Sequence, residues 1–551
     1  MKNINLQPLE KFNGRSGPLL LIIMDGIGIN KSSTYNALKA ANTEYLDKLI
    51  IHAKDQNLYT ELKAHGTFVG LPSDDLMGNS EVGHNAIGAG RIVEQRSTIT
   101  KKAIESGKLF KVEKWNNLVS HIENNESILH FIGLLSDGYV HSHISHLFGL
   151  LKGARSSNIQ KVRVHILLDG RDVPPQSALK YVEQLNEQLN IINENSEFNY
   201  KIASGGGRMH VTMDRYFSDW KVVKRGWQAH VCGIPERKEN YSGFFYSAES
   251  AIMQARANDP DISDQYLPSF VIIDENNKPI GKMNDKDAVI FFNFRGDRAI
   301  EISKAFDESN FSEFEKDCNP NVSYYGMMLY DDKLNIPKNY FLEPPKIENT
   351  LTSYLCAEKI PQFSIAETHK FGHIKYFFLG NRDESPCPDL DNYVEIKSDP
   401  SEEIEFKPQM KAFEVKNKLL EILNQGNYKF LRVNFANGDM VGHTGNFQSA
   451  KIAAETVNDC VKELTERMKE LAGLTIITAD HGNLENMDAF ETSHTLNNVM
   501  FTISDSKFNH EYQINKEVKN PGLGNIAASI LNLLGYQKPA GFLPSLISFK
   551  T

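Results

Sequence analysis

Continuous apolar runs alternate with amphipathic stretches along most of the chain. The clearest apolar runs are residues 19–24, 128–135, 162–168, 288–294 and 474–478. A strand that is buried on both faces reads as such an unbroken run, which is typical of parallel sheets covered by helices. Between these runs the spacing of apolar positions predicts helices at 36–53, 347–359 and 453–471. The alternation predicts an α/β fold built on parallel sheets.

Weaker patterns predict further elements. Shorter extended segments are expected at 58–70, 201–203, 363–366, 376–379 and 430–435. Residues 1–16 are polar and are expected to form a loose extension. Residues 383–405 are rich in Pro, Asp and Ser, so they are expected to form an exposed loop.

The chain of 551 residues is longer than one hydrophobic core usually serves, so two domains are expected. The paired prolines Pro344 and Pro345 interrupt the pattern, and residues 88–94 look like a second crossing point. If the chain passes from one domain to the other at both points, the middle of the chain is an insertion in the outer domain. We therefore predict an outer domain of residues 1–93 and 345–551, and an inserted domain of residues 94–344.

Composition narrows the classes of partner and compartment. The net charge of −10 is spread without a basic tract, which argues against nucleic acid and anionic membrane. The five cysteines have no paired spacing, so the sequence suggests neither a zinc ribbon nor a disulfide framework. The longest early apolar run is too short to span a bilayer, and no signal peptide is recognised. These features favour a cytoplasmic protein in a reducing compartment.

The stretch from Met77 to Arg91 holds Ser80 between a glycine-rich turn and an expected helix start. Backbone N–H groups at a helix start lack intrahelical partners and favour anions, so a hydroxyl held there could attack phosphorus. Serine is a weak nucleophile and needs a nearby base or a metal ion. Taken alone, Ser80 is better explained as a helix cap, and the metal-type ligands elsewhere in the sequence reverse this preference.

Acidic and histidine side chains recur where predicted strands end in the outer domain. Three carboxylates and three imidazoles are expected on one sheet edge: Asp25, Asp439, Asp480, His443, His481 and His494. Any one of these histidines could be a structural residue, but the set has the mixed oxygen and nitrogen ligands that suit Mn²⁺, Zn²⁺, Co²⁺ or Mg²⁺. Two such ions could activate Ser80 as the attacking oxygen and neutralise phosphoryl oxygens.

Arginines follow the predicted strand ends of the inserted domain: Arg171, Arg208, Arg215, Arg295 and Arg298. A guanidinium donates two parallel hydrogen bonds to phosphate or carboxylate, so their recurrence favours an anionic substrate over a merely solvated surface. Nucleotide sites are not indicated. Lys31 occupies the third glycine position of a dinucleotide fingerprint, and the loop at 205–208 lacks the ending of a P-loop.

A series of motifs resembles cofactor-independent phosphoglycerate mutases, of the alkaline phosphatase superfamily. The motifs are Asp-Gly-Ile-Gly at 25–28, Gly-Asn-Ser-Glu-Val-Gly-His-Asn at 78–85, Ser-Asp-Gly-Tyr-Val-His-Ser-His at 136–143, Asp-Gly-Arg-Asp-Val-Pro-Pro at 169–175, Phe-Arg-Gly-Asp-Arg-Ala at 294–299, Ala-Glu-Thr-His-Lys at 366–370, Asn-Gly-Asp-Met-Val-Gly-His-Thr-Gly at 437–445 and Thr-Ala-Asp-His-Gly-Asn at 478–483. They run in order over nearly the whole chain. The turns at 205–208, 294–299 and 380–382 depart from the family's usual residues, but none of these departures removes a ligand.

The resemblance implies an alkaline-phosphatase-like metal domain carrying an inserted phosphoryl-transferase domain. It implies interconversion of 3-phosphoglycerate and 2-phosphoglycerate through phosphoserine at Ser80, with two divalent metal ions, of which Mn²⁺ is favoured. By this likeness one ion is held by Asp439, His443 and His494, and the other by Asp25, Ser80, Asp480 and His481. Lys370 would steady the phosphoryl group, and Asp172 would be the acid and base for the glycerate hydroxyls. The substrate would be held by His141, Arg171, Asp172, Arg208, Arg215, Arg295, Arg298 and Lys370.

Two alternatives remain open from the sequence. A metal-dependent phosphohydrolase or a phosphopentomutase would use the same metal ligands, and a catalytically silent scaffold would keep them without turnover. A mutase must retain the glycerate after its phosphate leaves, so the segments at 88–94 and 341–345 are predicted to act as hinges that close over Ser80. A monomer is expected.

Overall fold

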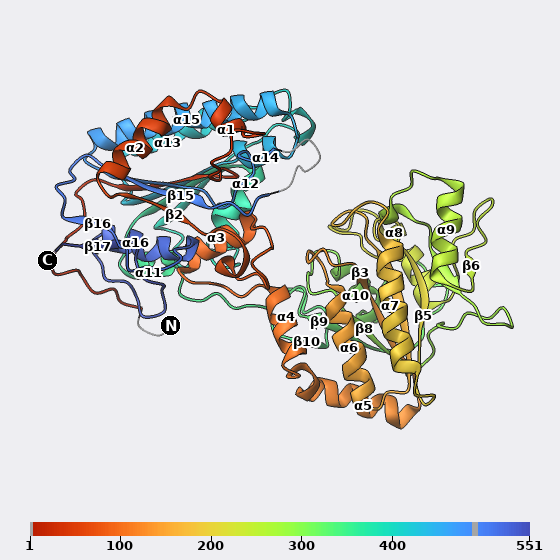
Figure 1. Cartoon of the computed structure of the whole chain (residues 1–551). Helices are drawn as coiled ribbons and strands as arrows, with labels where there is room; N and C mark the ends of the chain where they lie inside the picture. The colour runs from red at the N-terminus through yellow and green to blue at the C-terminus, as the bar shows by residue number, and fades with distance from the viewer. Residues whose placement is uncertain (1–3, 488–493, 551) are drawn as a thin grey trace. The chain divides into compact units, whose positions relative to one another are not determined.

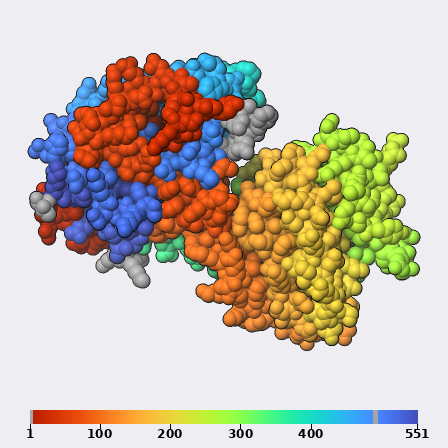
Figure 2. All heavy atoms as spheres, in the orientation of Figure 1, coloured from red at the N-terminus to blue at the C-terminus, as the bar shows by residue number. Residues whose placement is uncertain are grey.

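The computed structural model describes residues 4–487 and 494–550. The chain forms two compact units. Met1–Gln95 and Lys346–Thr551 make the first, called here the outer unit, and Arg96–Pro345 make the second, called the inserted unit (Figure 1). N-terminal and C-terminal parts of the chain, in red and blue, together form the visible surface of the outer unit (Figure 2). The chemical role predicted for each unit stays a prediction.

The sheet of the outer unit has the strand order β12-β11-β13-β1-β14-β15-β2. Its strands are β1 Leu19–Met24, β2 Tyr59–Leu62, β11 Gln362–Glu367, β12 Asp391–Ile396, β13 Phe430–Phe435, β14 Leu474–Thr478 and β15 Val499–Asp505. The first five in spatial order are parallel, and β15 and β2 run antiparallel to their neighbours. Every residue of the central strand β1 is buried. Because Met24 pairs with Phe435 and Ile23 with Thr478, the ends of β1, β13 and β14 are level.

Helices cover both faces of this sheet, with α2, α13 and α15 on one side and α3, α11 and α16 on the other (Figure 1). The α-helices of the unit are α1 Ala37–Ala40, α2 Glu44–Asp55, α3 Ser80–Ala89, α11 Leu351–Ala357, α12 Thr368–Gly372, α13 Ala412–Gln425, α14 Asn437–Gly442, α15 Phe447–Glu470 and α16 Ile526–Leu533. Shorter turns are η1 Gly66–Val69, η5 His373–Phe377, η6 Ser401–Glu403 and η7 Leu523–Asn525, and β16 Tyr512–Ile514 pairs with β17 Ile547–Phe549. The predicted apolar stripe of α15, which includes Val457, Val461 and Leu464, is buried.

The sheet of the inserted unit has the order β10-β9-β8-β3-β4-β5-β7-β6. Its strands are β3 Leu129–Leu135, β4 Lys161–Leu168, β5 Asn199–Gly207, β6 Phe244–Phe245, β7 Phe270–Ile272, β8 Ala288–Phe291, β9 Ser323–Met328 and β10 Tyr340–Leu342. Its helices and turns are α4 Arg96–Glu105, η2 Leu109–Lys111, α5 Glu113–Asn125, α6 Ile144–Ser156, α7 Ala178–Asn193, α8 Trp220–Gly226, η3 Trp227–Val231, α9 Ala248–Asn258, η4 Asp264–Tyr266 and α10 Ile300–Asp307. Strands β8, β3, β4 and β5 are parallel neighbours, so their carboxyl ends share one edge. The predicted α/β class with two units is confirmed.

Some local predictions are wrong. The segment at 376–379 is not a strand, because residues 373–377 form a π-helical turn whose Ile374 and Phe378 are buried one turn apart. Residues 383–405 include the edge strand β12 instead of being only a loop. The described part of the N-terminal extension is fastened, because Leu6 and Phe12 are buried and Leu9 N donates to Gly535 O at 2.8 Å. Periodicity alone cannot separate short buried helices from strands.

The prediction that the cysteines do not form disulfides is also wrong. Cys232 pairs with Cys318 in the inserted unit, and Cys356 pairs with Cys387 in the outer unit. The pairs are separated by 86 and 31 residues, yet their Cα atoms lie 5.6 and 5.7 Å apart. The fold brings them together, and spacing in the sequence does not reveal it. Cys460 is a free, buried thiol. Among the described helices, none is long and apolar enough to cross a membrane.

Candidate active site

Ser80 is the first residue of α3 and is 4% exposed. Asn79 caps the helix in an extended conformation, and its side chain accepts a hydrogen bond from Val82 N at 3.1 Å. The helix approaches the end of β14 closely at Gly83, where a Cβ atom would lie 2.7 Å from Asp480 O. A glycine is therefore required there, and the close approach brings Ser80 toward the carboxylates at the strand ends.

The hydroxyl of Ser80 is surrounded by charged groups. Lys370 Nζ donates to Ser80 Oγ at 2.6 Å, Ser80 Oγ donates to Asp25 Oδ1 at 3.2 Å, and His481 Nε2 lies 3.0 Å away. Lys370 also binds Asp25 Oδ1 at 2.8 Å and Asp439 Oδ2 at 2.6 Å. The predicted nucleophile, lysine and carboxylates thus meet at one point on the carboxyl edge of the sheet.

One group of candidate metal ligands is formed by Asp439, His443 and His494. Asp439 Oδ1 lies 3.2 Å from His443 Nε2 and 3.0 Å from His494 Nε2. The second ring nitrogen of His494, Nδ1, lies 2.8 Å from Gly78 O. A backbone carbonyl there accepts the Nδ1 proton, which leaves the Nε2 lone pair for a metal ion.

Two further groups share Asp25: one adds Asp439 and His481, and the other adds His84 and Asp480. Both oxygens of Asp480 are buried, and no described residue donates a hydrogen bond to either. A buried carboxylate without a donor is costly unless a cation neutralises it. The donor set and this carboxylate fit a divalent metal ion.

His84 joins this cluster, although the sequence analysis assigned it no role. Its Nδ1 lies 2.8 Å from Ser80 O and 3.2 Å from Asp480 Oδ2, and its Nε2 lies 3.1 Å from Asn434 Nδ2. Asn434 Nδ2 also donates to Asp25 Oδ2 at 2.7 Å. The amide nitrogen must face the carboxylate, so His84 Nε2 accepts and Nδ1 carries the proton. His84 therefore orients Ser80 through Ser80 O and lies beside Asp480 without donating to it. Its position four residues after Ser80 on one helix was the available signal.

Glu485 is a second residue that the sequence analysis missed. It is fully buried, and its Oε2 accepts from Gly28 N and Asn483 N, both at 2.9 Å. Its Oε1 accepts from Thr495 Oγ1. One carboxylate therefore fastens the loops that follow β1 and β14 and the residue next to His494.

The charges in the cluster compensate one another. Burial raises the pKa values of Asp25 and Asp439, but the Lys370 ammonium and the neighbouring histidines, His481 first among them, together outweigh burial and hold both pKa values well below their usual range. Burial lowers the pKa of Lys370, and the surrounding carboxylates raise it above its usual value. Burial likewise lowers the pKa of His481, but Asp480, Asp439 and Asp25 raise it to about 10. The site stabilises positive charge, as a metal site must.

The predicted arginine cluster lies at the carboxyl edge of the inserted unit's sheet. Asp297, which the sequence analysis did not single out, contacts several members of this cluster. Arg295 Nε donates to Asp297 Oδ1 at 3.0 Å, His141 Nδ1 lies 3.6 Å from that oxygen, and Arg215 Nη1 lies 3.8 Å from Oδ2. Burial and the nearby arginines, Arg208 first among them, hold the pKa of His141 well below its usual value. His141 is therefore neutral and can donate one hydrogen bond to an anion while accepting another.

Arg208 is buried beside the acid and base candidate Asp172. Its Nη1 donates to Asp169 Oδ1 at 2.8 Å and to Asp172 Oδ2. Asp169 Oδ1 also accepts from the backbone N–H groups of Arg171 at 3.2 Å and Asp172 at 3.1 Å. Burial raises the pKa of Asp172 although Arg208 opposes it. Asp172 is thereby held in place and biased toward accepting a proton.

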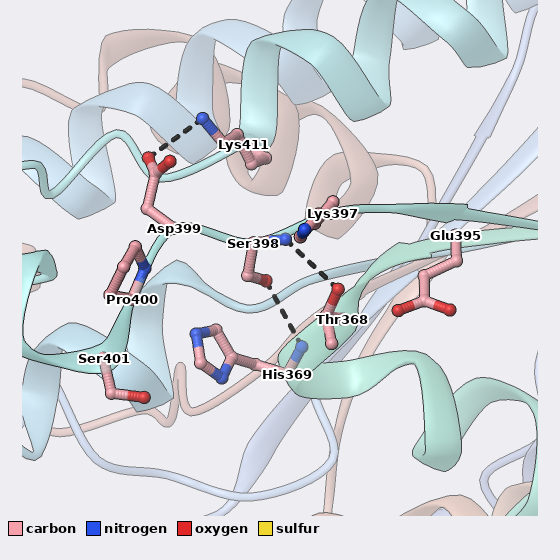
Figure 3. A pocket seen from close by; sticks show the side chains of 9 residues that line it. All are labelled: Thr368, His369, Glu395, Lys397, Ser398, Asp399, Pro400, Ser401 and Lys411. Atoms are coloured by element: carbon pink, nitrogen blue, oxygen red, sulfur yellow. Dashed lines mark hydrogen bonds and ion pairs between the residues drawn. The ribbon is translucent and has the colours of Figure 1, made fainter.

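A pocket of about 950 Å³ lies beside the turn that carries Lys370 (Figure 3). Its walls are bonded to one another: Ser398 N donates to Thr368 Oγ1 at 3.1 Å, and His369 N donates to Ser398 Oγ at 3.3 Å. Below them, Ser398 Oγ donates to Glu367 Oε2 at 2.9 Å. None of the predicted site residues lines this pocket. The hydrogen bonds in its wall hold Thr368 and His369, which precede Lys370 in the same helical turn.

Comparisons with known proteins agree on one family. Residues 100–332 match a family model described as the BPG-independent PGAM N-terminus. A probable 2,3-bisphosphoglycerate-independent phosphoglycerate mutase of Leptospira interrogans is 43% identical, over 98% of each chain. The Trypanosoma brucei brucei 2,3-bisphosphoglycerate-independent phosphoglycerate mutase is 40% identical, over 96% of this chain and 97% of its own. A crystal structure of Leishmania mexicana phosphoglycerate mutase at low cobalt concentration aligns over 99% of this chain and 100% of its own, with a TM-score of 0.78 and 38% identity.

Proposed function

The chain belongs to the family of 2,3-bisphosphoglycerate-independent phosphoglycerate mutases, and from this premise we propose that it interconverts 3-phosphoglycerate and 2-phosphoglycerate through a phosphoserine at Ser80. It is an isomerase that serves glycolysis and gluconeogenesis. The observation that carries the proposal is the position of Ser80 Oγ, 2.6 Å from Lys370 Nζ and 3.2 Å from Asp25 Oδ1.

In the first half-reaction Ser80 Oγ forms a bond to phosphorus while the bond from phosphorus to the glycerate oxygen breaks. Lys370, already bonded to Ser80 Oγ, balances the charge on the phosphoryl oxygens. Two divalent ions, held by Asp439, His443 and His494 and by Asp25, Ser80, Asp480 and His481, would lower the pKa of the serine hydroxyl and neutralise phosphoryl charge when bound. Mn²⁺ is our first candidate because the ligands mix oxygen with nitrogen, and Co²⁺, Mg²⁺ and Zn²⁺ are the alternatives.

In the second half-reaction the glycerate is held while its other hydroxyl attacks the phosphoserine. Asp172 gives a proton to the glycerate oxygen that leaves in the first half-reaction and takes one from the glycerate hydroxyl that attacks in the second. Ser80 Oγ starts and ends the cycle in the same protonation state, so the proton count closes. His141, Arg171, Arg208, Arg215, Arg295 and Arg298 retain the carboxylate and exclude water. The mechanism requires both sets of residues to act on one substrate molecule.

Product analysis separates this proposal from a phosphohydrolase of the same metal chemistry. Purified protein is incubated with 3-phosphoglycerate without 2,3-bisphosphoglycerate, before and after EDTA, and then with each metal restored. A mutase yields 2-phosphoglycerate, whereas a hydrolase yields inorganic phosphate. Ser80→Ala should abolish turnover, while the exposed control Ser506→Ala should not. Phosphate as the main product would refute the mutase assignment, and turnover in Ser80→Ala would refute the phosphoserine.

The remaining expectations are part of the proposal. A glycolytic substrate supports a cytoplasmic location. A reducing compartment was also inferred from unpaired cysteines in the sequence, and the two disulfides remove that support. We expect a monomer that acts on the small molecule alone, and size-exclusion chromatography with light scattering tests this.

A further inference from the structure

The loop from Thr212 to Asp219 carries Arg215 in an unusual backbone conformation. Thr212, Tyr216 and Phe217 have positive φ angles of 68°, 61° and 57°. Non-glycine residues are uncommon in this region of backbone conformation, and they persist only where their surroundings hold them. Tyr216 is 75% exposed, so its own side chain does not fix the loop. Other contacts must do so.

Two residues near the start of α10 fasten this loop. Arg298 Nη1 donates to Met213 O at 2.6 Å, and Glu301 Oε1 accepts from Phe217 N at 2.9 Å. Both contacts flank Arg215 in the sequence. Glu301 is only 2% exposed, so its carboxyl group is shielded from water.

A second carboxyl group, Asp214, lies against Glu301 and is bonded to it. Asp214 Oδ1 accepts from Ser218 Oγ at 2.8 Å, and Asp214 Oδ2 accepts from Asp219 N at 2.7 Å. Glu301 Oε2 is buried, and no described residue donates a hydrogen bond to it. Two buried carboxylates repel each other, so they can be bonded only if they share a proton.

The surroundings decide which carboxyl carries that proton. Burial raises the pKa of Glu301 to about 7. Burial also raises the pKa of Asp214, but hydrogen bonds from Asp219 N and Ser218 outweigh it and leave that pKa below its usual value. Below about pH 7 Glu301 is therefore the donor and Asp214 the acceptor.

We propose that Glu301 is a positioning residue: its protonated carboxyl donates to Asp214 and accepts from Phe217 N, and this double contact holds Arg215 where it binds the substrate. The inference rests on the proposed role of Arg215 in substrate binding. Glu301 itself touches neither the substrate nor the reacting atoms.

This arrangement makes substrate binding sensitive to pH. The charged groups acting on Glu301 are Asp214 on the loop and Lys304 on α10. Lys304 lies over the rings of Phe217 and Trp220, at 5.1 and 5.8 Å, and Asp219 caps α8. From β9 the titratable neighbour is Tyr324, whose hydroxyl is bonded to Ser303. Above about pH 7 Glu301 loses its proton, two anions face each other, and the loop loosens. KM for 3-phosphoglycerate should therefore rise with pH.

Steady-state kinetics at several pH values test the proposal, with Glu301→Ala, Glu301→Gln and the exposed control Glu313→Gln. Glu301→Ala leaves Asp214 and Phe217 N without their partner, so KM should rise about tenfold, with kcat changing far less. Glu301→Gln keeps a donor and an acceptor but cannot ionise, so KM should stay low and lose its rise with pH. The control should match the parent chain. An unchanged KM in Glu301→Ala, or a Gln variant as impaired as the Ala variant, would overturn the proposal.

Two further measurements separate positioning from simple folding and from the proposed function. If Glu301 acts through Arg215, Glu301→Ala should add nothing to the KM defect of Arg215→Ala, and additive effects would refute the coupling. Infrared spectroscopy at pH 6 should show a protonated carboxyl band that is absent in Glu301→Gln, and a band that does not change refutes the shared proton. The infrared result does not depend on activity, so it stands even if mutase turnover is never detected.

Discussion

Lys370 Nζ lies 2.6 Å from Ser80 Oγ, although 290 residues separate the two side chains. The same ammonium binds Asp25 and Asp439, so one cation holds the nucleophile against both candidate metal carboxylates. From these contacts we expect two roles for Lys370: it compensates the charge of the two carboxylates, and it assists phosphoryl transfer to Ser80.

Replacing Lys370 with methionine should remove both. We expect kcat to fall by about 10²–10³, as for the loss of a group that stabilises developing charge. The folded state should also lose stability, because the two buried carboxylates lose their counter-ion unless metal is added in excess. Coupled mutase assays and thermal melts measure the two effects. Lys407→Met, at an exposed lysine, is the control, and full activity in Lys370→Met would contradict the role.

His84 is expected to support metal binding without being a ligand. Its ring nitrogens are occupied by Ser80 O and Asn434 Nδ2, so His84→Ala should leave the ligands present but less well oriented. Loss of such an outer contact typically weakens metal affinity or activity by about 10–100-fold. Metal titration by calorimetry checks this, with exposed His510→Ala as the control. Equal affinity in both variants would mean that His84 is dispensable.

The cysteine pairs predict a thiol count. Without reductant, the denatured protein should present one reactive thiol, Cys460, and after reduction it should present all five. The native protein should present none quickly, because Cys460 is buried. Reduction should lower the free energy of unfolding by on the order of 4 kcal/mol for each bridge in the chain-entropy model. Five thiols in unreduced protein would contradict the pairing.

A buried histidine chain predicts acid sensitivity of the inserted unit. His130 Nδ1 lies 2.9 Å from His165 Nε2, and Ser204 Oγ lies 2.6 Å from His165 Nδ1 and 2.7 Å from His230 Nδ1. This hydrogen-bonded series of side chains ends at Asp287, whose Oδ2 lies 3.3 Å from His130 Nε2. Burial lowers the pKa values of His130 and His165, and it lowers that of His230 to about 3.

These histidines stay neutral in the fold but bind protons in the unfolded chain below pH 6.5. Unfolding therefore gains protons, and stability should fall as pH drops from about 6.5, by up to about 1.4 kcal/mol per pH unit for each histidine. Urea unfolding between pH 7.5 and 4.5 measures the slope. Replacing His230 with asparagine should reduce it, whereas replacing exposed His52 should not. An identical slope in both variants would rule out the buried histidines as the source of the pH dependence.

Much of the candidate site could be predicted from the sequence because of the geometry of parallel strands. Asp25 directly follows an apolar run, Asp480 follows a second after Ala479, and Asp439 follows a third after a short turn. The carboxyl ends of parallel strands share one edge, so runs far apart in the sequence could be assigned to one place. The arginines of the inserted unit follow the same logic on β4, β5 and β8. The catalytic roles of these residues stay predictions.

Other contacts could not be predicted from the sequence. Nothing near Glu485 or Asp297 signals that its carboxylate would join several loops, and the cysteine pairs depend on distances that only folding creates. The segment at 376–379 was misassigned because a short apolar run fits a strand or a helical turn equally well.

The sequence by itself determined the α/β class, the family and the side chains able to carry the chemistry, because periodicity and strand-end position are local properties of the chain. Tertiary structure alone decided which neighbours restrain those side chains. Asn434 donates to Asp25 and contacts His84, and Glu301 accepts from Phe217 N in the loop that carries Arg215. The physical reason is that burial and hydrogen bonding depend on what surrounds a group in space, and a neighbour in space has no fixed distance along the chain.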